Sequence, residues 1–170
     1  MCGIVGCVAE EPVSGILLDG LRRIEYRGYD SAGMATISNG KLSIRKGAGR
    51  ISKIEGRKKL SLLKGNIGMA HTRWATHGGV IDRNAHPHTA CNGRIAVIHN
   101  GIIENYLPLK KGLTSKGHKF KSETDTEVIA HLIEEEYEKT KDPLKATMRA
   151  TRRLTGQHAI AVLFKTGQTS

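Results

Sequence analysis

The sequence predicts a single α+β domain, in which short strands and helices follow one another with short connections. Three observations predict this class. Runs of small and branched apolar residues are typical of strands, and segments with apolar residues at helical spacing lie between them. The pair Asn39-Gly40 stands between two such runs and is typical of a two-residue hairpin, because both turn positions need positive φ. No internal repeat or interdomain linker is visible, so residues 1–170 are expected to form one domain.

Three strand regions and two helices are predicted for the first half of the chain. The apolar run 3–9 predicts a buried strand, and apolar positions at helical spacing predict a helix over 13–26. Residues 32–47 form the hairpin. The basic amphipathic segment 50–64 predicts a second helix, and residues 66–74 resume as a strand.

The second half is mostly helical, after a loop over residues 75–93 that is rich in Gly, His and Asn. Its clearest helical pattern covers residues 122–139. Ser122 or Thr124 can cap this helix, with an acid three residues later as the partner of a capping box, either Asp125 or Glu127. The other expected elements are a strand at 94–101, a helix at 102–116 that Pro108 interrupts, a helix at 143–154 and a strand at 158–164.

The charge pattern raises a rival interpretation, a basic domain that binds anions or nucleic acid, because the formal net charge is +11. The Lys and Arg residues are scattered in short clusters, however, and no nucleic-acid-binding motif accompanies them. With one Trp, four Tyr and two Phe, the chain also has few side chains for base stacking. The pattern therefore argues against a nucleic-acid partner.

Neither a membrane span nor a disulfide framework is expected. No apolar stretch approaches the roughly 18–20 residues that cross a bilayer, and the N-terminal apolar run is too short for a signal peptide. The three cysteines, Cys2, Cys7 and Cys91, are odd in number and contain no CxxC pair. A reducing cytoplasm fits this pattern.

The position of Cys2 suggests nucleophilic catalysis. If Met1 is removed, Cys2 carries a thiol and a free α-amine on one residue. The amine has a reference pKa of about 7.7–8.0 and can accept the proton of the thiol, whose reference pKa is about 8.5. One residue then supplies both nucleophile and base. The alternative is that Cys2 is a small apolar residue at the start of a strand.

Five further stretches of sequence accompany MCGIVG at the N-terminus: EYRGYDSAG (25–33), AHTRWATHG (70–78), NAHPH (84–88), HNGIIENY (99–106) and SETDTE (122–127). In this order they resemble the class II glutamine amidotransferases, whose N-terminal residue is cysteine. The resemblance is greatest to the glutaminase domain of the fructose-6-phosphate aminotransferases, which make glucosamine 6-phosphate. It reaches from Cys2 to about Leu154.

The resemblance implies the main roles in hydrolysis of L-glutamine. Cys2 attacks the side-chain amide, and Asn100 and Gly101 form the oxyanion hole through the Asn amide and the Gly backbone N–H. Arg73 grips the α-carboxylate, which suits the fork of a guanidinium, and Asp125 receives the α-ammonium. Without the flanking motifs, Arg73 would be a surface arginine, Asp125 a helix N-terminal acid and HNG a tight turn.

Further residues follow from the same resemblance. Thr76 and His77 are expected to line the glutamine pocket, and Trp74 lies in the loop that moves over the site, although a single Trp often fills a core. Arg27 and Gly28 are expected to support the Cys2 amine. The resemblance implies no cofactor.

The histidines do not predict a metal site. His86 and His88 are two residues apart, with His71, His77 or His99 as further candidate ligands. Zinc needs three or four convergent ligands, whereas Pro87 separates this pair and no HExxH or paired-cysteine spacing occurs. The Gly-rich turn KGAGR (46–50) lacks a following GK[ST] and is weak evidence for phosphate binding.

The likeness thins after RRLTG, at Gln157-His158, and the sequence reaches Ser170 before the last strands of the family domain. The sequence lacks the isomerase domains that would bind fructose 6-phosphate. Full-length members of this family are expected to be homo-oligomers. The family fold is the four-layer αββα sandwich of the N-terminal nucleophile hydrolases, expected here to be incomplete at its C-terminal end with an open sheet edge.

Three functions therefore stay open. The chain is a glutaminase that acts through a Cys2 thioester, a catalytically inactive glutamine-binding or interaction module because the domain is incomplete, or a basic domain that binds anions or nucleic acid.

Overall fold

The computed structural model describes residues 2–165, which form seven strands, five α-helices and three short 3₁₀ turns. The strands are β1 (Gly3–Val8), β2 (Ser31–Ser38), β3 (Lys41–Ala48), β4 (Ile67–Arg73), β5 (His88–Thr89), β6 (Ile95–Gly101) and β7 (His158–Phe164). The α-helices are α1 (Ser14–Ile24), α2 (Ile51–Lys58), α3 (Tyr106–Ser115), α4 (Glu127–Thr140) and α5 (Pro143–Thr151). The 3₁₀ turns are η1 (Glu25–Arg27), η2 (Leu60–Leu62) and η3 (Asp82–Asn84).

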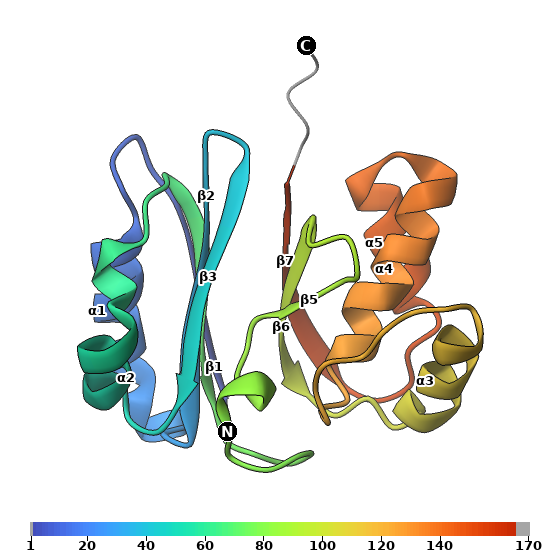
Figure 1. Ribbon diagram of the computed structural model, residues 1–170, viewed down its shortest axis with the longest axis horizontal. Helices are drawn as coiled ribbons and strands as arrows, with labels where there is room; N and C mark the ends of the chain where they lie inside the picture. The colour runs from blue at the N-terminus through green and yellow to red at the C-terminus, as the bar shows by residue number, and fades with distance from the viewer. Residues whose placement is uncertain (1, 166–170) are drawn as a thin grey trace.

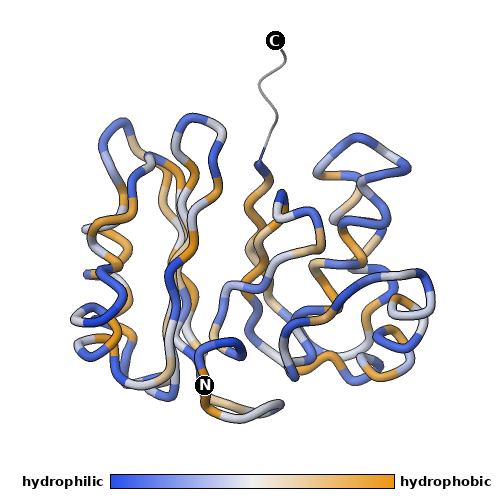
Figure 2. Tube along the Cα trace, viewed as in Figure 1, coloured by the Kyte–Doolittle hydropathy of each residue, from blue (hydrophilic) through white to orange (hydrophobic). Residues whose placement is uncertain are grey.

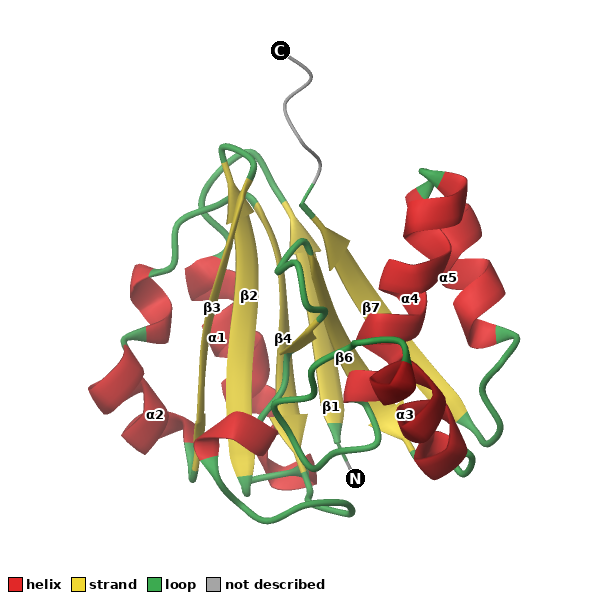
Figure 3. Ribbon diagram, turned by 45° about the vertical axis from the view of Figure 1, so that its right-hand side comes forward, coloured by secondary structure: helices red, strands yellow, loops and turns green. Residues whose placement is uncertain are grey.

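Two antiparallel sheets pack face to face between two layers of helices (Figures 1 and 3). The first sheet has the strand order β1-β4-β2-β3 and is covered by α1 and α2. The second has the order β5-β6-β7 and is covered by α3, α4 and α5. This arrangement confirms the expected four-layer αββα sandwich. Within the described residues, β7 forms one edge of its sheet.

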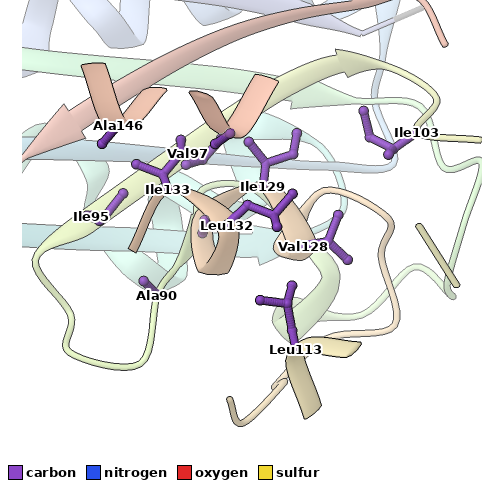
Figure 4. Packing of buried hydrophobic residues seen from close by; sticks show 12 residues of the cluster. Ala90, Ile95, Val97, Ile103, Leu113, Val128, Ile129, Leu132, Ile133 and Ala146 are labelled. Carbon is purple, nitrogen blue, oxygen red and sulfur yellow. The ribbon is translucent and has the colours of Figure 1, made fainter. Parts of the chain in front are cut away.

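Three apolar layers hold the sandwich together, and hydrophobic segments follow the strands of both sheets (Figure 2). Helix α1 packs Leu17 and Leu21 onto the first sheet. On the other side, α4 packs Ile129 and Ile133 onto the second sheet (Figure 4). The layer between the sheets is thinner, and its fully buried members are Ala35, Met69, Ala96 and Ile98.

Most element positions agree with the sequence prediction, including the hairpin, where Asn39 and Gly40 have φ of 48° and 68°. Residues 3–9 were predicted to form a buried strand, and this was wrong in one respect. Strand β1 lies at the edge of its sheet and is only partly buried. Val5 packs under the helices, Ile4 packs between the sheets, and Val8 is 75% exposed.

Several helix boundaries differ from the prediction: α3 begins at Tyr106 rather than at residue 102, and α5 ends at Thr151 rather than at residue 154. Pro108 lies in the first turn of α3 rather than interrupting a helix, because first-turn N–H groups have no intrahelical acceptor. The segment 50–64 ends its helix at Lys58, where Lys59 takes a left-handed φ of 54°. Helix α4 begins at Glu127, so residues 122–126 form a loop and not a capped first turn. No helix in the described part of the chain is long and apolar enough to cross a membrane.

Replacing Ile129 by Ala should lower the free energy of unfolding by about 2–5 kcal/mol, because it leaves a cavity between α4 and the second sheet. Ile129 is 0% exposed, whereas Ile16 on α1 is 54% exposed, and Ile16→Ala is the matched control with an effect below about 0.5 kcal/mol. Urea denaturation followed by circular dichroism measures both. Equal losses would contradict this account of the core.

Candidate active site

Cys2 lies where the start of β1 meets the end of β4. The strands are antiparallel with Gly3 opposite Thr72, which brings the thiol beside the residues that follow Arg73. The Cys2 Sγ accepts a hydrogen bond from the Trp74 backbone N–H, with N···S 3.3 Å. The half-buried thiol borders a hollow of about 610 Å³. Its other lining residues are Arg27, Trp74, Thr76, Asn100, Gly101, Ile102, Gln157, His158 and Ala159.

The second sheet brings Asn100 to the same point. Asn100 lies near the end of β6, and its side-chain Nδ2 donates to the Cys2 carbonyl oxygen at 3.2 Å. An amide nitrogen carries two N–H groups, so this bond leaves one for a ligand beside the thiol.

His71 fixes which way the Asn100 amide points. Its Nε2 lies 2.9 Å from Asn100 Oδ1 and 3.0 Å from the His99 carbonyl oxygen. Both partners are acceptors, so Nε2 carries the proton and the amide oxygen faces His71. Burial lowers the pKa of His71 to about 3, so the ring is neutral near pH 7 and this tautomer is retained.

Gly101 follows with a φ of +129°, a conformation that side-chain-bearing residues rarely adopt. A Cβ at this position would lie 2.1 Å from the Gln157 carbonyl oxygen on the neighbouring segment. The end of β6 and the start of β7 therefore approach closely only because residue 101 is glycine.

Arg73 and Asp125 lie in a recess next to the thiol. Both are 4% exposed, and both line a small recess together with Cys2, His99 and Thr126. Burial lowers the pKa of Arg73, while the charges of Cys2 and Asp125 act in the opposite direction. The recess thus holds a cation and an anion next to a nucleophile.

Arg73 also organises the loop that follows it. Its Nη2 donates to the carbonyl oxygens of His77 and Gly78, and its Nη1 donates to that of Gly79 at 3.4 Å. A guanidinium has five N–H donors, so these contacts do not use all of them.

Asp125 is held in the loop before α4. Its Oδ2 accepts a hydrogen bond from the Ile103 backbone N–H at 2.8 Å. The loop itself is closed by the carboxylate of Glu127, which accepts from the backbone N–H groups of Lys121 and Ser122 and from the Ser122 hydroxyl.

Trp74 and Thr76 both line the hollow. The Trp74 ring is 45% exposed and packs edge-on against Tyr29, so it does not fill a core. The His77 ring packs against Tyr106 with centroids 5.1 Å apart and does not line the hollow, and only its carbonyl oxygen contacts Arg73.

Arg27 and Gly28 lie beside the site. Arg27 lines the hollow, and Gly28 passes so close to Arg73 that a Cβ would lie 2.8 Å from the Arg73 carbonyl carbon. Their expected contact with the Cys2 amine depends on removal of Met1, which lies outside the described residues.

Residues that the sequence prediction did not select also shape the site. Asp30 accepts from the Ala75 backbone N–H at 2.8 Å and donates its own backbone N–H to the Arg73 carbonyl oxygen at 3.2 Å. From the sequence, His71 is only a candidate metal ligand. Asp30 belongs to the motif YRGYDS, and a carboxylate in that loop is the sequence signal that could have indicated its role.

Four buried histidines form a cluster behind the site, the histidine stack, in which the rings of His71, His86 and His88 contact one another. His71 and His86 stack with ring centroids 4.1 Å apart, and His86 packs edge-on against His88 at 4.8 Å. His99 donates its backbone N–H to His86 Nδ1, and His88 Nε2 lies 3.1 Å from the Thr124 hydroxyl. His86 Nδ1 and His88 Nε2 therefore have protein partners, whereas His71 Nδ1 and His99 Nε2 are buried without one.

Comparisons with known proteins show the family that the chain matches. Residues 71–170 match the family described as the glutamine amidotransferase domain. The chain is 54% identical over 166 residues to the glutamine–fructose-6-phosphate aminotransferase of Pyrococcus horikoshii, and the match covers 96% of this chain and 27% of that protein. The same enzyme of Zymomonas mobilis is 52% identical, with 97% and 27% covered. The chain thus spans about a quarter of the length of these relatives.

Solved structures show the same fold. The glutamine phosphoribosylpyrophosphate amidotransferase from B. subtilis superposes with a TM-score of 0.83 at 28% identity, covering 98% of this chain and 36% of that chain. A structure described as the allosteric regulatory enzyme of purine biosynthesis has a TM-score of 0.85 at 30% identity and also covers 98% of this chain and 36% of its own.

The histidine stack predicts loss of stability in mild acid. Burial lowers the pKa of His71 to about 3, that of His99 to about 4, and those of His86 and His88 well below 6.5. Below pH 6.5 the unfolded chain therefore binds more protons than the folded chain, and stability falls as pH falls.

A histidine with a folded pKa of about 3 destabilises the fold by about 2 kcal/mol at pH 5 relative to pH 7.5. His131 acts oppositely: burial alone lowers its pKa, but the carboxylates of Glu127 and Glu134 outweigh burial and raise it. Urea denaturation at the two pH values measures the sum. A stability that is unchanged or higher at pH 5 would contradict the neutral stack.

Proposed function

The chain belongs to the glutamine amidotransferase domain family, and from this membership we propose that it is the glutaminase portion of a glutamine–fructose-6-phosphate aminotransferase. It hydrolyses L-glutamine to glutamate and ammonia. The observation that carries the proposal is the convergence of three groups from different parts of the fold. The thiol of Cys2, the amide of Asn100 and the Arg73–Asp125 recess meet at one point.

The reaction begins with Cys2 in the form that remains after Met1 is removed. The α-amine takes the thiol proton, and the sulfur attacks the γ-carbonyl carbon of glutamine. The negative charge that develops on the carbonyl oxygen is stabilised by the free N–H of the Asn100 side chain and by the Gly101 backbone N–H. The C–N bond then breaks, the amine returns its proton to the leaving nitrogen, and ammonia departs.

Water completes the cycle. The γ-glutamyl thioester at Cys2 is attacked by a water molecule that gives its proton to the α-amine, and a second tetrahedral intermediate collapses to glutamate and the free thiol. The same two N–H groups stabilise its oxyanion. His71 contributes by keeping the Asn100 oxygen turned away, so that the amide presents donors to both intermediates.

Glutamine is recognised by charge at its α-carbon. We assign the α-carboxylate to the unused N–H donors of Arg73 and the α-ammonium to Asp125. Both side chains are buried in the recess beside Cys2, where ion pairs are screened less than at the surface. Thr76 and Trp74 border the hollow next to this recess. His77 contributes only its carbonyl oxygen, which accepts a hydrogen bond from Arg73.

The acceptor half of the activity belongs to sequence that this chain does not contain. Relatives of the same family are about four times as long, and their name includes the isomerising transfer to fructose 6-phosphate. We propose that ammonia from the Cys2 site serves that acceptor in the cytoplasm, bound by further domains or a separate subunit, in a homo-oligomeric enzyme.

Replacing Cys2 by Ala should reduce glutamate release to background, because the nucleophile is lost. The matched control is Cys7→Ala, which removes a thiol that packs toward α1 and does not line the hollow. Intact mass before and after treatment with a glutamine-mimicking alkylator should show a chain without Met1 and one adduct, absent from Cys2→Ala. Glutaminase activity that survives Cys2→Ala would refute the mechanism, whereas glutamine binding without release would identify an inactive binding module.

Asp125→Asn should raise KM for glutamine by about tenfold or more with a smaller effect on kcat, because the α-ammonium loses its counter-charge while Asn still accepts from the Ile103 N–H. Glu123→Gln, in the same loop but paired with Arg83 at the surface, is the control. Steady-state kinetics of glutamate release measure both variants. An unchanged KM in Asp125→Asn would remove Asp125 from the binding site.

A further inference from the structure

A second group of reactive side chains lies away from the Cys2 hollow. Cys91, His118, His131 and Glu134 each offer one ligand atom, and these four atoms all lie within 4.8 Å of one another. None of the four residues lines the hollow or the recess at Cys2. Their chemistry is not used by the proposed reaction.

Five of the six distances between these atoms are close to the edges of a tetrahedron. The two Nδ1 atoms of His118 and His131 are 3.2 Å apart, and Cys91 Sγ lies 3.9 Å and 3.6 Å from them. Glu134 Oε2 is 3.2 Å and 3.6 Å from the same nitrogens. Zinc bonds of about 2.0–2.1 Å to nitrogen and about 2.3 Å to sulfur give tetrahedral N···N and N···S separations of about 3.4 Å and 3.6 Å.

Three separate segments supply the four ligands. Cys91 lies in the turn between β5 and β6, His118 in the connection between α3 and α4, and His131 and Glu134 are three residues apart on one face of α4. The apolar core beneath them already holds these segments together, since Ala90 and Leu113 pack with Leu132 in one cluster (Figure 4).

An outer layer of contacts orients the ligands. Cys91 Sγ accepts from the Lys119 backbone N–H at 3.3 Å, a contact that stabilises a thiolate. The Glu134 carboxylate accepts from the backbone N–H groups of Cys91 and Asn92 at 3.2 Å and 2.9 Å. His131 Nε2 is buried without a hydrogen bond and lies 3.6 Å from Glu127 Oε1. A carboxylate behind the far nitrogen is the usual support of a metal-bound histidine.

One atom of this group, His131 Nε2, is buried without a hydrogen-bond partner. The Nδ1 atoms of His118 and His131 face each other and the Cys91 sulfur. In a hydrogen bond between the two nitrogens, one must donate a proton and only the other can accept it. A cation at the centre instead uses every lone pair. Sulfur and nitrogen donors select zinc over magnesium or calcium, and four protein ligands leave no open position for substrate.

We propose that Cys91, His118, His131 and Glu134 form a structural zinc site that ties the β5–β6 turn and the α3–α4 connection to α4. Its role is stability of the second sheet and its helices.

The test is zinc binding by the purified chain in a Cys2→Ala background, because the thiol and amine of Cys2 can themselves chelate a metal. After removal of metal with a chelator, Zn²⁺ is titrated in competition with a chromogenic chelator, and thermal unfolding is followed with and without Zn²⁺. We expect one ion per chain and a higher Tm with Zn²⁺. Co²⁺ in place of Zn²⁺ should give a thiolate-to-metal charge-transfer band.

Two ligand variants and one control make the result specific. Cys91 is exposed, so Cys91→Ser should fold and should weaken zinc binding by about tenfold or more and remove the charge-transfer band. His118→Gln should weaken binding similarly. Cys7→Ser should change neither. No stoichiometric binding, or binding that Cys91→Ser and His118→Gln leave unchanged, would overturn the proposal and leave the group as a hydrogen-bonded cluster.

Discussion

The structure depends on one buried contact between its two sheets, the hydrogen bonds from His71 Nε2 on β4 to the Asn100 side chain and the His99 carbonyl oxygen on β6. Because the apolar layer between the sheets is thin, side chains of the two sheets meet directly there. The contact therefore sets the spacing of the sheets and the direction of an amide that faces Cys2. Burial keeps the ring neutral, which removes the cost of a charge in this layer.

Around this contact, the site is built from strand ends. Arg73 and Asn100 lie at the ends of β4 and β6, and Cys2 directly precedes β1. Each of the three also makes a hydrogen bond with a backbone group. Gly28 and Gly101 matter for the same reason, because each lets one segment of backbone approach another within a distance that a Cβ would prevent. Strand ends thus carry Arg73 and Asn100, whereas Asp125 comes from the loop before α4.

Much of the fold could be predicted, and the part that could not was decided by contacts distant in sequence. Local signals located the hairpin at Asn39-Gly40 and the strand 158–164 correctly. The start of α4 was placed five residues early, because Ser122 has capping chemistry that the structure uses to bind the Glu127 carboxylate within a loop. No local pattern could reveal that His71 orients Asn100, or that Cys91 meets a histidine 40 residues later.

The separation between Cys2 and Asn100, 98 residues along the chain, has a consequence for biosynthesis. Translation proceeds from the N-terminus, so the thiol leaves the ribosome first while β6 is still unmade. During that interval the nascent polypeptide exposes its cysteine without the amide that would stabilise an oxyanion or the acid that would hold an amino group. In the proposed mechanism, reactivity toward an amide is thus withheld until the second sheet has docked, so that folding and the removal of Met1 are both needed to activate the thiol.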